Sequence, residues 1–77
     1  MANVHQPATL TGVCLGAEYR FSVRSVSSPM AFRARAIMLN SGVGISGFGN
    51  TREAAVRSMQ DRVRNYVEDC IARGWAR

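Results

Sequence analysis

The chain has 77 residues, of which 47% are hydrophobic and 19% charged, a composition typical of a globular and not of a disordered protein. A chain this short buries only about 60% of its unfolded surface, so we expect one small domain with a core of one sheet and one helix. Apolar runs stay far below the ~20 residues of a membrane span, and the first residues lack the features of a secretory signal. The sequence therefore predicts a cytoplasmic protein with no membrane partner.

The net charge and the small number of potential metal ligands narrow the possible function classes further. Ten basic residues, all arginine, outnumber five acidic ones and give a formal net charge of +5. A positive field favours nucleic acid or an acidic protein surface as the partner. Cys14 and Cys70 lie far apart in the sequence, and His5 is the one histidine, which is too little for a zinc site within one chain. We expect no metal, no cofactor and two structural thiols.

The first part of the chain predicts a tail followed by strands. Residues 1–8 are expected to form a flexible tail, and residues 9–77 a single α+β domain. Residues 9–15 read as a short strand, although the sequence leaves open whether this strand joins the sheet. Residues 18–26 alternate with the period of two that is typical of a half-buried strand. Tyr19, Phe21 and Val23 share one face of it, and Arg20, Ser22 and Arg24 share the other.

Two further strands continue the pattern. A turn at 27–29 leads to a second alternating strand over 30–39, and a turn at 40–42 leads to a short strand over 43–48. Consecutive strands joined by short turns predict an antiparallel meander with one face open to solvent. On the strand over 30–39, the outward residues are Arg33, Arg35, Ile37 and Leu39.

From Asn50 to Arg73 the hydrophobic period becomes that of a helix. Asn50 with Glu53 forms a reasonable capping pair, and Thr51 is the alternative cap. Gly74 is expected to end the helix in a left-handed conformation. The predicted fold is thus an antiparallel three- to four-stranded sheet with one C-terminal helix packed on one face. The core-facing stripe of the helix comprises Ala55, Met59, Val63, Tyr66, Val67 and Cys70.

A glycine-rich stretch, "GVGISG" at 42–47, matches the G-x-G-x-x-G pattern of dinucleotide-binding loops. Such a loop requires a parallel βαβ unit, whereas the strands expected here are antiparallel. A Walker loop requires a lysine, which the chain lacks. We interpret Gly42 as a turn residue, and Gly47 or Gly49 as a bend into the helix. We predict one functional site at the start of the helix, a phosphate site formed by Gly49, Arg52 and Arg57.

The segment "GISGFGNTREAAVRSMQDRVRNYVEDCIARG" resembles the HicB-like antitoxin fold. It has a short strand, a small-residue turn, T-x-E-A-A at the helix start and Y-V-x-D near the helix end, and two strands precede it. The resemblance covers about residues 18–74 and implies the sheet-and-helix fold and a protein partner that is neutralised by docking. The family's C-terminal DNA-binding segment has no counterpart before Arg77, and the chain is basic where that family's sheet domain is commonly acidic.

The order of strands followed by a helix also resembles the later part of double-stranded-RNA-binding domains, which implies that Arg52 and Arg57 grip phosphates. In size and architecture the chain is similar to small phage proteins that inhibit bacterial defence complexes.

Catalysis is not expected, because His5 lies in the tail and most carboxylates lie on the helix beside arginines, so no acid–base or nucleophile–base constellation can be named. We expect a small non-enzymatic binding module.

The predicted partner-binding residues lie on the open sheet face. A solvated face with no partner is the ordinary alternative. The preferred hypothesis is an antitoxin-like or phage-type inhibitor that docks on a protein, because Tyr19, Phe21 and Phe32 point inward and cannot stack on bases. The alternative is an RNA- or DNA-binding domain, and either can form a homodimer through a sheet edge or the open face. The predicted partner-binding residues are Arg20, Arg24, Arg33, Arg35, Ile37 and Leu39.

Overall fold

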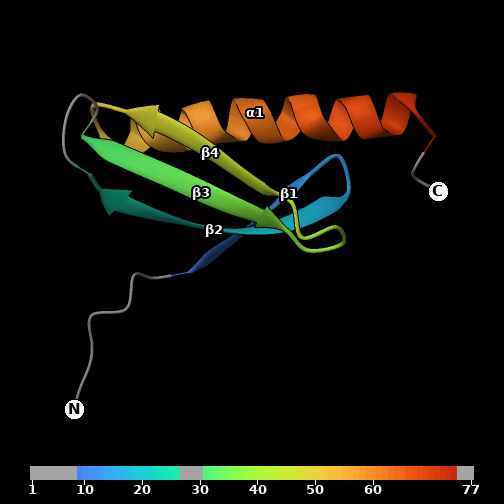
Figure 1. Ribbon diagram of the computed structural model, residues 1–77, viewed down its shortest axis with the longest axis horizontal. Coiled ribbons are helices and arrows are strands. Elements are labelled where there is room, and N and C mark those ends of the chain that lie inside the picture. The colour runs from blue at the N-terminus through green and yellow to red at the C-terminus, as the bar shows by residue number, and fades with distance from the viewer. Residues whose placement is uncertain (1–8, 27–30, 75–77) are drawn as a thin grey trace, which may run out of the picture.

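The computed structural model describes residues 9–26 and 31–74, so the predicted tail at 1–8 and the turn at 27–29 lie outside the described residues. Its four strands form one antiparallel sheet in the order β1-β2-β3-β4, and a single C-terminal helix lies on one face of it, which confirms the predicted α+β fold (Figure 1). The elements are β1 (Leu10–Cys14), β2 (Ala17–Ser25), β3 (Phe32–Met38), β4 (Gly44–Gly49) and α1 (Arg52–Ala72). In the described residues, the helix is not apolar enough to cross a membrane.

The structure settles that the first strand joins the sheet. β1 pairs antiparallel with β2, from Leu10 opposite Phe21 to Cys14 opposite Ala17. Gly12 in the middle of β1 lies opposite Tyr19, and a Cβ on Gly12 would lie 2.5 Å from Cζ of the Tyr19 ring. The glycine therefore leaves room for the buried ring and does not interrupt the strand.

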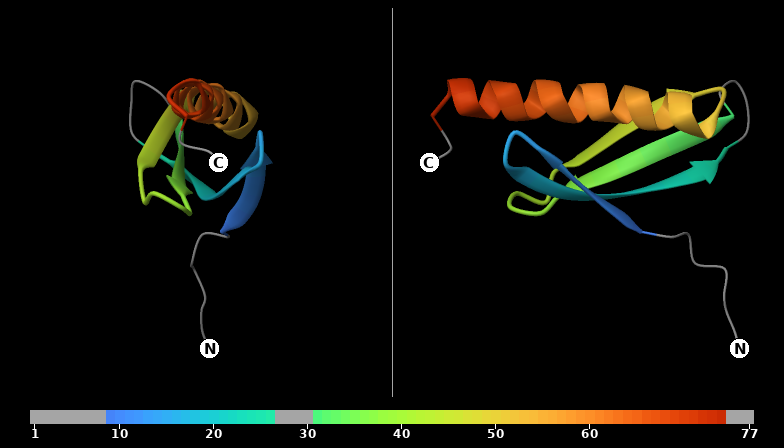
Figure 2. Two further views of the ribbon diagram at one scale, coloured as in Figure 1. Left: turned by 90° about the vertical axis from the view of Figure 1, so that its right-hand side faces the viewer. Right: turned by 180° about the vertical axis from the view of Figure 1, so that it is seen from behind.

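The core lies between α1 and the inner face of the sheet. The helix lies over β3 and β4, and β1 curls away at the far side of the sheet (Figure 2). Alanines on β3 face the helix, and their small side chains let it come close. Tyr66 and Cys70, which were expected in the buried stripe, are half-buried at its border. The buried hydrophobic residues are Ala17, Tyr19, Ala34, Ala36, Met38, Ala55, Met59, Val63 and Val67.

Two glycines of β4 allow the helix to pack closely on this strand. Gly47 and Gly49 are buried and point toward α1. A Cβ on Gly47 would lie 2.6 Å from the Met59 Cα, and one on Gly49 would lie 2.6 Å from the Ala55 backbone nitrogen. Real Cβ atoms do not approach backbone so closely, so the helix backbone packs directly on the strand backbone. The predicted bend does not lie at Gly47, through which β4 runs; the strand ends at Gly49, and the chain bends at residues 50–51 before α1.

The helix ends follow local capping rules. Thr51 is the N-cap: its backbone is extended, and its Oγ1 accepts a hydrogen bond of 3.0 Å from the Ala54 N–H. The prediction that Asn50 is the N-cap is therefore wrong, and the alternative, Thr51, is confirmed. Gly74 has φ +81° just after the last turn, as predicted.

We expect Thr51→Ala to lower the free energy of unfolding by about 1 kcal/mol, because the Ala54 N–H loses its side-chain acceptor. Asn50→Ala is the control, since Thr51 and not Asn50 supplies the cap oxygen. Urea unfolding followed by circular dichroism measures both. Equal stability of Thr51→Ala and the wild type would contradict the assignment of the cap.

Candidate binding face

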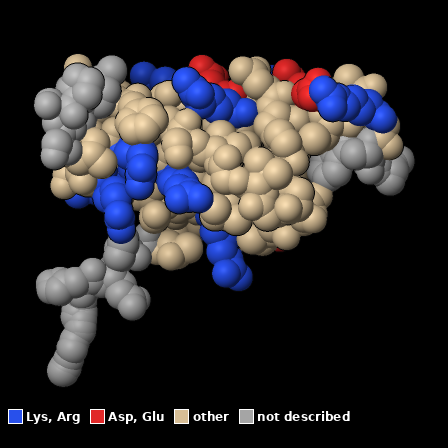
Figure 3. Space-filling model, viewed as in Figure 1, with Lys and Arg blue, Asp and Glu red and all other residues tan. Residues whose placement is uncertain are grey.

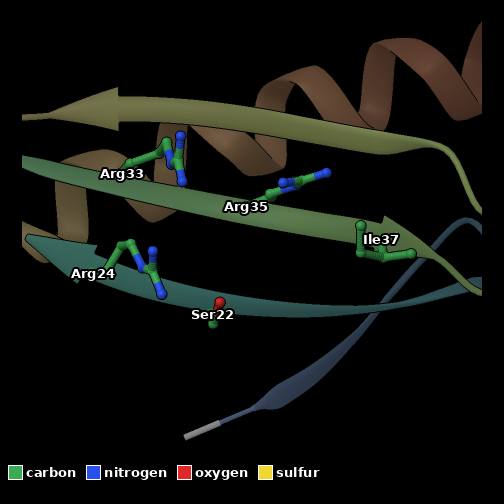
Figure 4. Close-up of a pocket in the computed structure, with 5 residues that line it drawn as sticks. All are labelled: Ser22, Arg24, Arg33, Arg35 and Ile37. Atoms are coloured by element: carbon green, nitrogen blue, oxygen red, sulfur yellow. The ribbon is translucent and has the colours of Figure 1, made fainter. Parts of the chain in front are cut away.

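The sheet face opposite α1, here called the open face, carries a hollow of about 330 Å³. Side chains from two adjacent strands form its walls and project away from the helix (Figure 4). Alternation produces this arrangement, because the residues between them on β2 and β3 face the core. We call it the arginine hollow, and it is lined by Ser22, Arg24, Arg33, Arg35 and Ile37.

Strand register brings the guanidinium groups together. Arg24 on β2 lies opposite Arg33 on β3, and Ser22 lies opposite Arg35. Directly opposed residues on one sheet face are only about 5 Å apart between Cβ atoms. Three of the predicted partner-binding arginines therefore share one surface, which Figure 3 shows as a group of basic side chains over β2 and β3.

Acidic side chains of the described residues do not neutralise this surface. The ion pairs Arg64–Glu68 (3.2 Å) and Arg73–Asp69 (3.1 Å) lie on α1 and at its C-cap, on the other side of the sheet. The half-buried Arg33 has its Nε atom shielded from solvent without a hydrogen-bond partner in the described structure. A partly desolvated cation beside like charges is unfavourable, so a negative charge placed at the arginine hollow would lower its electrostatic energy.

Two of the predicted open-face residues lie outside the hollow. Arg20 is exposed on the same face opposite Ile37, nearer β1, but it is not part of the lining. Leu39 lies in the turn after β3, because the strand ends at Met38 and not at residue 39 as predicted. Its backbone N–H donates to the Glu18 carbonyl, and its side chain is 46% exposed. The apolar end of the face therefore begins with Ile37.

The open face also presents an aromatic residue that the sequence pattern did not predict there, Phe48. It lies on β4 directly opposite Arg33 and is 45% exposed. Tyr19, Phe21 and Phe32 pack on the helix side, as predicted, but the open face nevertheless presents the aromatic ring of Phe48. The local sequence gives little signal for this orientation, because glycines carry no side chain; the burial of Gly47 and Gly49 on either side shows that Phe48 faces outward.

The structure does not bring the predicted phosphate-binding residues together. Gly49 is buried in β4, and the guanidinium carbon of Arg52 lies 5.1 Å from the centre of the Phe32 ring. Arg57 follows five residues later, about 140° around the helix from Arg52. It lines a separate groove of about 620 Å³ on the outer side of α1, with Ala54, Ser58, Asp61, Arg62 and Asn65.

No group of three or more His, Cys, Asp or Glu side chains that could hold a metal ion occurs within 9–26 and 31–74. Comparison of the chain with protein-family models, curated proteins and solved structures finds no match.

Proposed function

We propose that this chain is a non-enzymatic, cytoplasmic binding module that binds nucleic acid through the arginine hollow. The observation that supports the proposal best is the convergence of Arg24, Arg33 and Arg35 without a carboxylate partner, beside the exposed ring of Phe48. Guanidinium groups bind phosphate oxygens through two parallel N–H donors. A phosphate polymer supplies several such charges at the spacing of neighbouring side chains, which a single small anion does not.

Equilibrium binding of a fluorescent oligonucleotide at several salt concentrations tests this function. Neutralisation of phosphates releases counterions, so affinity is expected to fall steeply between about 50 and 200 mM salt. With three guanidiniums on the phosphates of a single strand, the slope of log K against log salt is expected to be roughly −2. Absence of binding at the lowest salt would contradict the proposal.

Docking on an acidic protein is the second candidate, in the manner of an antitoxin-like or anti-defence inhibitor. Exposed aliphatic side chains beside the arginines favour it: Ile37 is 37% exposed, and Leu39 and Val43 near the β3–β4 turn are 46% and 38% exposed. Mixed apolar and arginine surfaces are typical of protein interfaces. A host protein that stays bound after nuclease treatment and at moderate salt, and is released by Ile37→Asp, would favour this candidate over nucleic acid.

The module is further proposed to form a homodimer through the free edge of β1. The segment Leu10–Leu15 carries no charge, and Leu10, Val13 and Leu15 are 49%, 65% and 55% exposed. Edge strands without charge or proline pair readily with another strand. Dimerisation through the open face is less favourable, because it would bring the arginines of two copies together.

A lysine on the β1 edge is expected to prevent this dimer, because charged side chains, lysine above all, are a means by which edge strands avoid pairing with another chain. We expect wild-type protein to sediment as a dimer and Val13→Lys as a monomer in analytical ultracentrifugation. Val43→Lys, at an exposed site away from β1, is the matched control. A wild-type protein that stays monomeric at high concentration would contradict the proposed edge pairing.

A further inference from the structure

We infer that the open face selects unpaired nucleotides, with Phe48 as the residue that stacks on a base, an inference that rests on the proposed nucleic-acid binding. The register of the sheet places Arg24, Arg33 and Phe48 in one row across β2, β3 and β4. Adjacent strands are about 4.8 Å apart. A nucleotide with its base on the ring therefore has its phosphate within reach of the neighbouring guanidiniums.

The packing of β4 holds the ring in its outward position. Gly47 and Gly49, the neighbours of Phe48, are buried against the backbone of α1 at Met59 and Ala55. A slip of one residue would turn Phe48 into a contact that does not admit even a Cβ atom. The ring is therefore presented to solvent by the same contact that attaches the helix.

The open face of β4 also leaves the ring accessible. Beyond Phe48, the outward residues of this strand are Ser46 and Gly44, and Ser46 lies opposite Arg35. Both are small, so side chains of β4 do not rise beside the ring to screen it. A flat group can lie along β4 while its charged part remains over the arginine hollow.

The arginine hollow and the ring of Phe48 together discriminate between nucleic acids by the accessibility of their bases. In a duplex the base faces are stacked on one another and the outside presents phosphates, so only the arginines would be used. In a single strand the bases are free to stack on an aromatic side chain, which is a sequence-tolerant contact. An acidic peptide would satisfy the arginines but has no regular flat group for Phe48. The ligand class that uses every feature of the site is single-stranded RNA or DNA.

The test compares three probes of equal length: a single-stranded oligonucleotide, its duplex, and a single strand with abasic sites throughout. The wild type is expected to bind the first about tenfold more tightly than the other two, the size of one base–aromatic stack. Phe48→Leu keeps an apolar side chain but removes the stacking surface. It is expected to lose that tenfold preference while its affinity for the abasic strand and its salt dependence stay unchanged. Ile71→Ala, at a comparably exposed apolar site on α1, is the control and is expected to bind like the wild type.

The outcomes separate the two proposals. Equal affinity for all three probes, reduced by Arg33→Gln, would overturn the selection of unpaired bases and leave nucleic-acid binding standing. A single-strand preference that persists in Phe48→Leu would overturn the role of Phe48. Failure of all three probes to bind, with a folded protein by circular dichroism, would overturn both proposals and favour an acidic protein as the partner.

Discussion

Replacement of Gly47 by alanine is expected to lower the free energy of unfolding by about 3 kcal/mol, near the upper end of overpacking effects. The added methyl group would overlap the backbone of Met59, and backbone cannot rotate away as a side chain does. Relief requires α1 to move off β4, which would open contacts along the whole helix.

Gly44→Ala is the matched control for this variant. It changes the same residue type in the same strand, but its Cβ would meet the end of the flexible Arg35 side chain at 3.2 Å. Both replacements reduce the entropy of the unfolded chain equally, so the difference between them reports the native contact. Urea unfolding of the two variants measures that difference. Equal stability of Gly47→Ala and Gly44→Ala would show that helix and strand are not in direct backbone contact.

The second large effect concerns binding. The double variant Arg33→Gln/Arg35→Gln is expected to weaken binding of a single-stranded oligonucleotide by at least about 100-fold, since each charge-assisted hydrogen bond contributes about 1.5 kcal/mol or more. The salt slope should become shallower by about 1.4, or 0.7 for each phosphate no longer neutralised on a single strand. Anisotropy titrations over a salt series measure both quantities.

The control variant Arg62→Gln/Arg64→Gln separates the effect of where the arginines lie from the effect of the net charge of the protein. It removes the same number of arginines from exposed positions on α1, on the opposite side of the molecule from the arginine hollow. Its affinity is expected to fall by less than threefold, because charges far from the site are screened over about 10 Å at ordinary salt. Equal losses in the two double variants would indicate a diffuse charge effect and contradict a localised site.

Much of the fold follows from local patterns in the sequence. Alternation over residues 18–26 predicted both faces of β2, and the helical period predicted which side of α1 is buried. The pattern around Gly12 was weaker, because the reason for a glycine there is the ring of Tyr19 on the neighbouring strand. A cross-strand contact of this kind has no signal in the local sequence, so the membership of β1 in the sheet stayed open.

The candidate site was predicted only in part, because contacts between strands have no signal in the local sequence. Arg24, Arg33 and Arg35 followed from alternation alone, but their register opposite one another depends on how β2 and β3 pair. Phe48 was missed because its neighbours are glycines, which carry no hydrophobic signal although Gly47 and Gly49 are buried. Gly47 completes a nucleotide-binding pattern in the sequence, whereas its physical role, shared with Gly49, is to allow the close approach of α1.

The most direct test of the binding face is an arginine side-chain NMR titration, in which the Nε–H signals of ¹⁵N-labelled protein are followed as a short single-stranded oligonucleotide is added. The structure predicts that the signals of Arg24, Arg33 and Arg35 shift together and saturate at one affinity, while those of Arg62 and Arg64 on α1 stay in place. Shifts confined to the helix arginines, or no shift at a concentration where the oligonucleotide is bound, would contradict the assignment of the arginine hollow as the binding site.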